Sequence, residues 1–149
     1  MITLIKTGAM MLEVGILNSK IASLLARAGH MDEIIVCDAG FPIPTEVETI
    51  DLVVSENHPT VQEVLEVLLK YFSVEKIIMA EETKQHSPSH FKRMVKLFGP
   101  NVALETVPHT AFKERSHRVK GIIRTGDFTS YANVLLVSGA GGRWFVEKK

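Results

Sequence analysis

Apolar and polar positions along the chain follow two periods, one typical of amphipathic helices and the other of buried strands. After Asn18-Ser19, which are polar residues suited to a helix start, apolar residues recur every three or four positions as far as Gly29. The expected buried face of this helix consists of Ile21, Leu24, Leu25 and Ala28. The run Ile34 to Cys37 then has no polar position, as in a strand that is buried on both faces. The pattern therefore predicts a helix, a stop at Gly29, and a buried strand.

The same alternation continues along the rest of the chain. Thr60-Val61-Gln62-Glu63 is a capping box, and it begins an apolar stripe that runs to Phe72. Ser87-Pro88 predicts a further helix that places Phe91, Met94, Val95 and Phe98 toward the core before Gly99-Pro100 ends it. The other expected elements are strands Ile50 to Val54, Lys76 to Ala80, Ala103 to Val107, Gly121 to Arg124 and Val134 to Val137, and a short helix around Thr110 to His117. We expect the Ile50 to Val54 run, like Ile34 to Cys37, to be buried on two faces.

About six strands and four helices thus alternate without a linker, a low-complexity tract or an internal repeat. This organisation predicts a single α/β domain folded as a three-layer α/β/α sandwich around a central sheet. We expect the domain to occupy residues 11–149, with a C-terminal extension from about residue 138. Residues 1–10, with one lysine and a short apolar run, are too short for a signal peptide or a spanning helix, and we interpret them as a leader or a non-native extension.

Charge and cysteine content narrow the possible ligands and the compartment. Seventeen basic and seventeen acidic residues give a formal net charge of zero, so no overall field favours nucleic acid or an anionic membrane. A neutral small molecule is the expected ligand. The single cysteine, Cys37, lies in an apolar strand and cannot form an internal disulfide. We interpret it as a buried small hydrophobe in a protein of the reducing cytoplasm.

Candidate chemistry lies where expected strands end, because ligands of open α/β sheets usually bind beyond the carboxyl ends of strands. Asp38 follows the first strand, Glu81-Glu82 the third and His109 the fourth. If these strands are parallel neighbours, the three positions meet at one edge of the sheet. We interpret Glu81-Glu82 as structural, because adjacent residues of a strand point to opposite faces.

Two other patterns are weak indications of a metal or phosphate site. His86 and His90 have the four-residue spacing of a zinc helix, but the helix that begins at Ser87-Pro88 separates them. Gly139-Ala140-Gly141-Gly142 has neither the lysine of a phosphate loop nor a full dinucleotide fingerprint, and we interpret it as a flexible tail before Trp144. We therefore expect no metal and no cofactor.

One long segment carries a family resemblance. Gly29-His30-Met31-Asp32 leads into the first strand, which ends in Cys37-Asp38-Ala39-Gly40-Phe41-Pro42-Ile43-Pro44. Further along the chain, and in the same order as in the family, are Ala80-Glu81-Glu82-Thr83-Lys84, His109 and Ser130-Tyr131-Ala132-Asn133. From Met11 to about Val137 the chain resembles the D-ribose pyranase and L-fucose mutarotase family, and the residues that follow its first strand look more like the ribose branch.

The resemblance implies roles for particular residues. His30 is the implied proton donor, and an imidazole suits this task because its ordinary pKa of about 6.5 allows proton transfer near neutrality. Asp38, His109 and the triplet Tyr131-Ala132-Asn133 are the implied sugar-binding residues. Without the resemblance, His30 is better explained as a cation at the C-terminal end of a helix, and Asp38 is equally well explained as a turn former.

The resemblance also implies an activity and an assembly. The implied enzyme is a cofactor-independent isomerase that interconverts the pyranose and furanose forms of D-ribose by opening and reclosing the ring. Two alternatives stay open, namely L-fucose mutarotase activity by the same chemistry and a non-catalytic sugar-binding or regulatory protein. Because the family forms rings with sites at or near subunit contacts, we expect a homo-oligomer, a ring-shaped decamer, with Trp144 and Phe145 covering an interface. We expect no nucleic acid or membrane partner.

Overall fold

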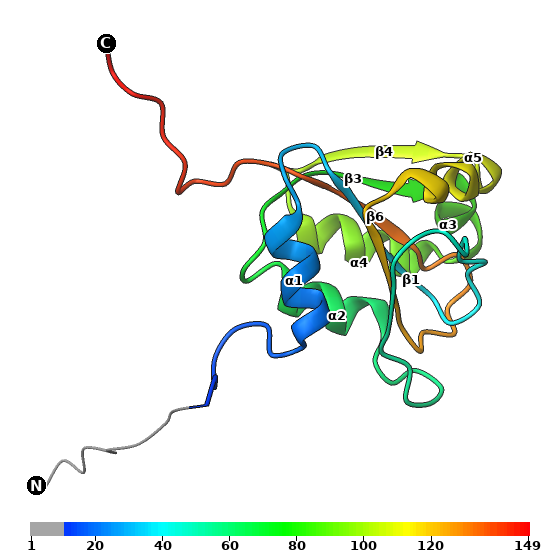
Figure 1. Cartoon of the computed structure of the whole chain (residues 1–149). Coiled ribbons are helices and arrows are strands. Elements are labelled where there is room, and N and C mark those ends of the chain that lie inside the picture. Colours follow the sequence, from blue (N-terminus) through cyan, green and yellow to red (C-terminus); the bar gives the residue numbers. More distant parts are fainter. Residues whose placement is uncertain (1–10) are drawn as a thin grey trace, which may run out of the picture.

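The computed structural model describes residues 11–149, which form one mixed sheet with helices on both faces (Figure 1). The expectation for residues 1–10 lies outside the described residues. In the described range the helices are α1 (Ser19–Arg27), α2 (Val61–Leu68), α3 (Glu81–His86), α4 (Pro88–Phe98) and α5 (His109–Arg115), with a 3₁₀ turn η1 (Ser116–Arg118) after α5. The strands are β1 (Glu33–Cys37), β2 (Thr49–Asp51), β3 (Val74–Ala80), β4 (Ala103–Val107), β5 (Gly121–Arg124) and β6 (Val134–Ser138).

The strand order of the sheet is β2-β5-β1-β6-β3-β4. The pairs β2/β5, β5/β1 and β3/β4 are parallel, whereas β6 is antiparallel to both of its neighbours, β1 and β3. Five strands therefore point in one direction, and β6 runs against them in the middle of the sheet. As a result, the amino end of β6 lies between the carboxyl ends of β1 and β3.

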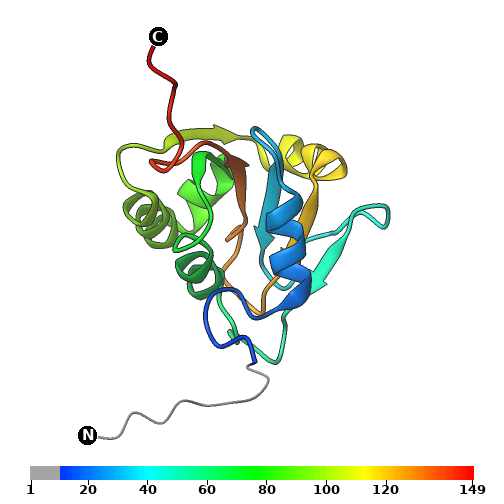
Figure 2. The same ribbon diagram turned by 60° about the vertical axis from the view of Figure 1, so that its left-hand side comes forward.

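The core consists of two apolar layers, one on each face of the sheet. Along β1, Ile34 and Val36 face the layer formed with α1, α2 and α4, while Ile35 and Cys37 face the layer that contains Phe112 of α5. Figures 1 and 2 show α1, α2 and α4 on the first face and the shorter α5 on the other. The three-layer α/β/α prediction is confirmed, with outer layers of unequal size.

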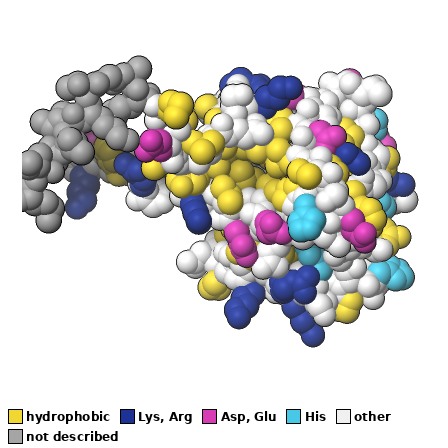
Figure 3. All heavy atoms as spheres, turned by 90° about the horizontal axis from the view of Figure 1, so that it is seen from below, with side chains coloured by type: hydrophobic (Ala, Val, Ile, Leu, Met, Phe, Trp, Pro, Cys, Tyr) yellow, Lys and Arg dark blue, Asp and Glu magenta, His cyan; other side chains and the backbone are white. Residues whose placement is uncertain are grey.

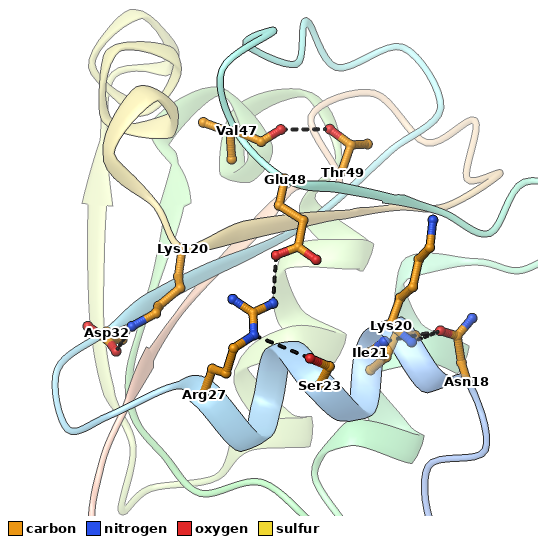
Figure 4. Close-up of polar contacts among 10 residues, drawn as sticks. All are labelled: Asn18, Lys20, Ile21, Ser23, Arg27, Asp32, Val47, Glu48, Thr49 and Lys120. Atoms are coloured by element: carbon orange, nitrogen blue, oxygen red, sulfur yellow. Dashed lines mark hydrogen bonds and ion pairs between the residues drawn. The ribbon is translucent and has the colours of Figure 1, made fainter.

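Helix α1 forms as its sequence predicts. The Asn18 side chain accepts hydrogen bonds from the backbone N–H groups of Lys20 and Ile21, both at 3.0 Å (Figure 4). At the other end, Arg27 donates to Glu48 at 2.7 Å, which ties the helix to the residue before β2. The chain then turns through Gly29, whose N–H donates to the Asp32 carboxylate at 2.7 Å.

The second apolar run, Ile50 to Val54, was wrongly expected to be buried on both faces. Only Thr49–Asp51 form β2, and β2 lies at the edge of the sheet, where it pairs with β5 alone. The chain leaves the sheet after Asp51, whose carboxylate accepts from Val53 N at 3.0 Å, and Val54 is 83% exposed. A strand this short at an edge buries one side chain, Ile50.

The described helices also differ from the expected four. Glu81-Glu82 are the first turn of α3 rather than the end of a strand, so the expectation that they alternate between faces is wrong. Helix α2 ends at Leu68, and Phe72 packs against the core from the loop that follows. On α4 the buried residues are His90, Phe91 and Met94, while Val95 is 38% exposed. The buried face of α4 therefore includes His90 in place of Val95.

Candidate functional site

A hollow of about 610 Å³ lies at the edge of the sheet where β1 and β5 end and β6 begins. Residues that follow β1, β4 and β5, as the strand-end rule predicts, line it together with residues that precede β6. The lining residues are Asp38, Ala39, Gly40, Phe41, Pro42, His109, Arg124, Asp127, Phe128, Thr129, Ser130, Tyr131 and Asn133. Of the six site residues expected from the sequence, the structure thus brings Asp38, His109, Tyr131 and Asn133 to one hollow, with Ala132 between the last two.

Asp38 is the first residue after β1 and is half-buried. Its N–H donates to the Asn133 side-chain oxygen at 2.8 Å, and its carboxylate accepts from the Gly40 N–H at 3.0 Å. Burial raises the pKa of Asp38, and the negative charge of nearby Asp127 raises it further. The hollow therefore holds a carboxylate that gains from any hydrogen-bond donor brought close to it.

His109 begins α5 and lies beside Tyr131, with ring centroids 4.9 Å apart in an edge-on arrangement. Its backbone N–H donates to the Glu82 carboxylate at 2.8 Å, so Glu82 holds the start of α5, a structural role. Burial lowers the pKa of His109, and Lys113 lowers it further, so the ring is neutral at pH 7. Within the described part of the chain, its Nδ1 is buried without a hydrogen-bond partner. A buried polar atom usually has a partner, so the unpaired Nδ1 marks His109 as a candidate ligand-binding residue.

The triplet before β6 presents three different groups. Tyr131 has a φ of 56°, in the left-handed region that a side chain disfavours. The Ala132 side chain is fully buried, so this residue offers only its main chain. Asn133 is 3% exposed, and since its oxygen accepts from Asp38 N, its amide N–H groups are left for other partners.

Arg124 and Asp127 also line the hollow, and neither was expected there from the sequence. Arg124 donates from Nε and Nη2 to the Ala39 carbonyl at 3.1 and 2.9 Å, which fixes the turn after Asp38. Asp127 is 4% exposed and accepts from Val61 N at 2.9 Å and Thr129 N at 2.8 Å. The strand-end rule that selected Asp38 applies equally to Asp127, three residues after β5, and was the signal available in the sequence.

His30 precedes β1 and Asp38 follows it, so the two residues lie at opposite ends of the strand. With a rise of about 3.3 Å per residue, the six residue steps from Asp32 to Asp38 span about 20 Å. The His30 side chain is 63% exposed, and its Nε2 is 3.0 Å from a carboxylate oxygen of Glu75. It borders a second hollow of about 590 Å³, with Tyr71, Ser138 and Trp144 among the lining residues. One chain therefore does not bring His30 to the residues around Asp38.

Gly139 lies against Glu75 and helps to explain where that carboxylate stands. A Cβ at Gly139 would be 2.5 Å from Glu75 Cβ, a contact too close for any larger residue. The Gly139 N–H also donates to the Ser73 carbonyl at 3.1 Å. The beginning of the glycine-rich segment is thus packed against the start of β3 rather than forming a free tail.

The two histidines with zinc-like spacing lie on different helices. His86 ends α3 and stacks on Tyr131 with a centroid distance of 5.5 Å, whereas His90 is buried on α4 with its Nε2 3.0 Å from the Ala132 carbonyl. They do not share a helical face, as predicted. Cys37 is fully buried, and burial raises its pKa to about 12, which confirms its interpretation as a small core residue.

Comparison with known proteins gives a consistent result. Residues 11–141 match the RbsD / FucU transport protein family. The D-ribose pyranase of Thermotoga neapolitana is 49% identical over 133 residues, which are 87% of this chain and 98% of that protein. The structure of Bacillus subtilis RbsD complexed with D-ribose superposes with a TM-score of 0.84 at 40% identity, covering 88% of this chain and 99% of that one. The fucose mutarotase of Streptococcus pneumoniae, in complex with L-fucose, has the same fold, with a TM-score of 0.69 at 20% identity over 84% of this chain and 94% of that one.

Proposed function

The chain belongs to the RbsD / FucU transport protein family, and we propose that it is an isomerase that interconverts the pyranose and furanose forms of D-ribose. The observation that carries this proposal is its similarity, over nearly their full lengths, to a D-ribose pyranase and to an RbsD that binds D-ribose. The family resemblance read from the sequence is confirmed, and with it the α/β fold.

The proposed reaction needs only proton transfer. The ring oxygen of the pyranose gains a proton while the anomeric hydroxyl loses one, the C1–O bond of the ring opens, and a different hydroxyl then closes on C1. No atom changes its oxidation state overall, so acid and base side chains with an oriented open chain are sufficient. Such groups contribute on the order of 10²- to 10⁴-fold in rate.

The hollow around Asp38 has the groups that a polyhydroxylated sugar requires. We propose that the Asp38 carboxylate and neutral His109 Nδ1 accept hydrogen bonds from sugar hydroxyl groups. In this proposal the Asn133 amide donates hydrogen bonds to sugar oxygens. The phenol of Tyr131 and the main chain at Ala132 complete the proposed sugar contacts. A volume of about 610 Å³ accommodates a monosaccharide.

We propose that His30 is the proton donor and that it reaches the sugar from a second copy of the chain. In one chain the two groups of residues lie at opposite ends of β1, so they can act on one sugar only across a subunit contact. Glu75 orients the His30 ring in this proposal, because it faces Nε2 and leaves Nδ1 for the substrate.

Exposed apolar surface supports self-association. Trp144 and Phe145 are 78% and 89% exposed in the single chain. A separate apolar groove of about 380 Å³ lies between the segment before α1 and helix α2, and Figure 3 shows hydrophobic side chains gathered on the face seen from below. Such surfaces are commonly covered in oligomers. A homo-oligomer, expected from the family to be a ring-shaped decamer, is part of the proposal.

The partners and the compartment follow from the same considerations. None of the helices in the described part of the chain is long and apolar enough to cross a bilayer. With zero net charge, the proposed ligand is a neutral sugar rather than a nucleic acid or a membrane surface. The proposed compartment is the reducing cytoplasm, which fits the single free cysteine.

The test is saturation-transfer NMR on D-ribose and on L-fucose, each with and without the protein at one temperature. We expect exchange between ribose pyranose and furanose signals to be faster, per enzyme, than exchange between the fucose anomers. A preference for fucose would select the mutarotase alternative. Calorimetric binding of ribose without any increase in exchange would select a sugar-binding protein.

A further inference from the structure

The loop before β6 is held by side chains from the corner between α3 and α4. Three consecutive carbonyls of this loop, at Ser130, Tyr131 and Ala132, each accept one side-chain hydrogen bond. The donors are Ser87 Oγ to Ser130 at 2.6 Å, Thr83 Oγ1 to Tyr131 at 2.6 Å and His90 Nε2 to Ala132 at 3.0 Å. We call Thr83, Ser87 and His90 the carbonyl clamp.

The clamp is mostly shielded from water. Thr83 is fully buried and His90 is 2% exposed. Burial lowers the pKa of His90, so the ring is neutral, and because a carbonyl only accepts, its proton is on Nε2. Hydrogen bonds in such surroundings are costly to break, since water cannot easily replace the lost donor.

The loop needs an external restraint, because Tyr131 has a left-handed backbone conformation that a tyrosine seldom adopts. Its carbonyl is the one that Thr83 holds. Fixing this peptide fixes the direction of the Tyr131 side chain, whose ring lies between His109 and His86. The next residue but one, Asn133, bonds to Asp38. Asp38, His109 and Asn133, which contact or follow the clamped segment, all line the hollow.

We propose that Thr83, Ser87 and His90 are positioning residues for the sugar site, acting through the backbone of residues 130–132 rather than by touching the ligand. None of the three lines the hollow. The proposal rests on the function proposed above, since it assigns these residues to recognition of that substrate. It predicts that loss of one donor alters the position of Tyr131 while the overall fold persists.

The test compares Thr83→Val, which removes the hydroxyl at nearly constant shape, with Thr83→Ser, which retains it. The chain has two tyrosines, and Tyr71 is exposed and lies near the His30 end, so ring-labelled tyrosine gives two NMR signals with one as an internal reference. In Thr83→Val we expect the Tyr131 signal to move or broaden and KM for ribose to rise about tenfold with a smaller change in kcat. Thr83→Ser should restore both toward the parent.

Ser116→Ala is the matched control. Ser116 is 1% exposed and donates its hydroxyl to the Lys113 carbonyl at the far end of α5, so the variant loses a similar bond away from the loop. We expect Ser116→Ala to be less stable than the parent protein but to keep the parent KM and the parent Tyr131 signal. Ser87→Ala provides a second, less buried test if Thr83→Val does not fold.

Two results overturn the clamp. The first is that the Tyr131 NMR signal of both Thr83→Val and Ser87→Ala matches that of the parent protein. The second is that the Tyr131 signal is displaced in these variants while KM for ribose stays at the parent value. If the parent protein itself leaves ribose exchange unchanged, the proposed function fails, and the sugar-free tyrosine spectra still decide whether the three donors position Tyr131.

Discussion

The Asp38 carboxylate lowers the stability of the fold at neutral pH, and we propose that it binds the sugar. Burial and the nearby Asp127 charge raise its pKa, so the folded protein disfavours the ionised form relative to the unfolded chain. The stability that depends on this group is fully present below its ordinary pKa of 3.8 and is lost as the pH rises through the folded value. At neutral pH the carboxylate therefore destabilises the fold.

Asp38→Asn separates these two effects. The amide oxygen can still accept from Gly40 N, so we expect a higher melting temperature than the parent at pH 7 and no advantage below pH 3.8. Ribose affinity should fall about tenfold or more, because an uncharged acceptor binds hydroxyls more weakly. Thermal unfolding at the two pH values and titration calorimetry measure the two effects. Unchanged affinity would return Asp38 to the role of a turn former.

His30 and its partner Glu75 can be tested by single substitutions. Since His30 is largely exposed, His30→Ala should keep the parent melting temperature and lower kcat on the order of 10²- to 10⁴-fold. Glu75→Gln should lower kcat by a smaller factor of about ten, because the ring loses a charged partner that fixes its orientation. NMR exchange rates at saturating ribose give both values. Glu114→Gln, an exposed carboxylate on α5, is the control, and equal rates in His30→Ala and the parent would contradict the proton-donor role.

At the scale of elements, helix α2 connects the core to the hollow through its first turn. Two side chains accept from that turn, the Thr60 hydroxyl from Glu63 N at 3.2 Å and the buried Asp127 carboxylate from Val61 N at 2.9 Å. Asp127 belongs to the loop after β5, so it fastens this loop to the helix. The Thr60 cap predicted from the sequence is present, and Asp127, 66 residues away from Val61 in the chain, provides a stronger one.

The two caps should differ in their effect on stability. Thr60→Ala removes an exposed cap and should lower the free energy of unfolding by about 1 kcal/mol. Asp127→Ala leaves two amide groups without their acceptor and should lower it by about 2–3 kcal/mol. Urea unfolding of the two variants measures the difference. A larger effect from Thr60→Ala would show that the local cap, rather than the loop contact, holds α2.

At the scale of the whole molecule, the sheet separates the proposed acid from the proposed sugar contacts. His30 precedes β1 and Asp38 follows it, so a complete site in our proposal requires two copies. This arrangement makes assembly a condition of activity rather than an addition to it.

Mixing two inactive variants tests the shared site. His30→Ala and Asp38→Ala, refolded together in equal amounts, should form about a quarter of sites with both native residues if the two come from different copies. Exchange rates measured at ribose concentrations below the parent KM should then recover to about that fraction of the parent, while each variant alone stays well below it. No recovery in an oligomer shown by ultracentrifugation to contain both chains would place the two residues in one chain.

The local elements were largely determined by the sequence. Caps at Asn18 and Thr60 and the stop near Gly29 depend on interactions within about four residues. The apolar runs of β1, β3, β5 and β6 depend on burial that a run of apolar residues requires by itself. Family motifs also led us to expect a sugar site at Asp38, His109 and Tyr131-Ala132-Asn133, and the structure places Asp38, His109, Tyr131 and Asn133 around one hollow.

What only the tertiary structure decided was which ends of the strands meet and which distant groups join them. No periodicity specifies that β6 runs antiparallel between β1 and β3, which creates the hollow. The donors at Thr83, Ser87 and His90 were hidden for the same reason, since their partners are more than 40 residues away. Hydrogen-bond partners at that separation are selected by packing of the completed sheet, and the sequence near each residue carries no record of them.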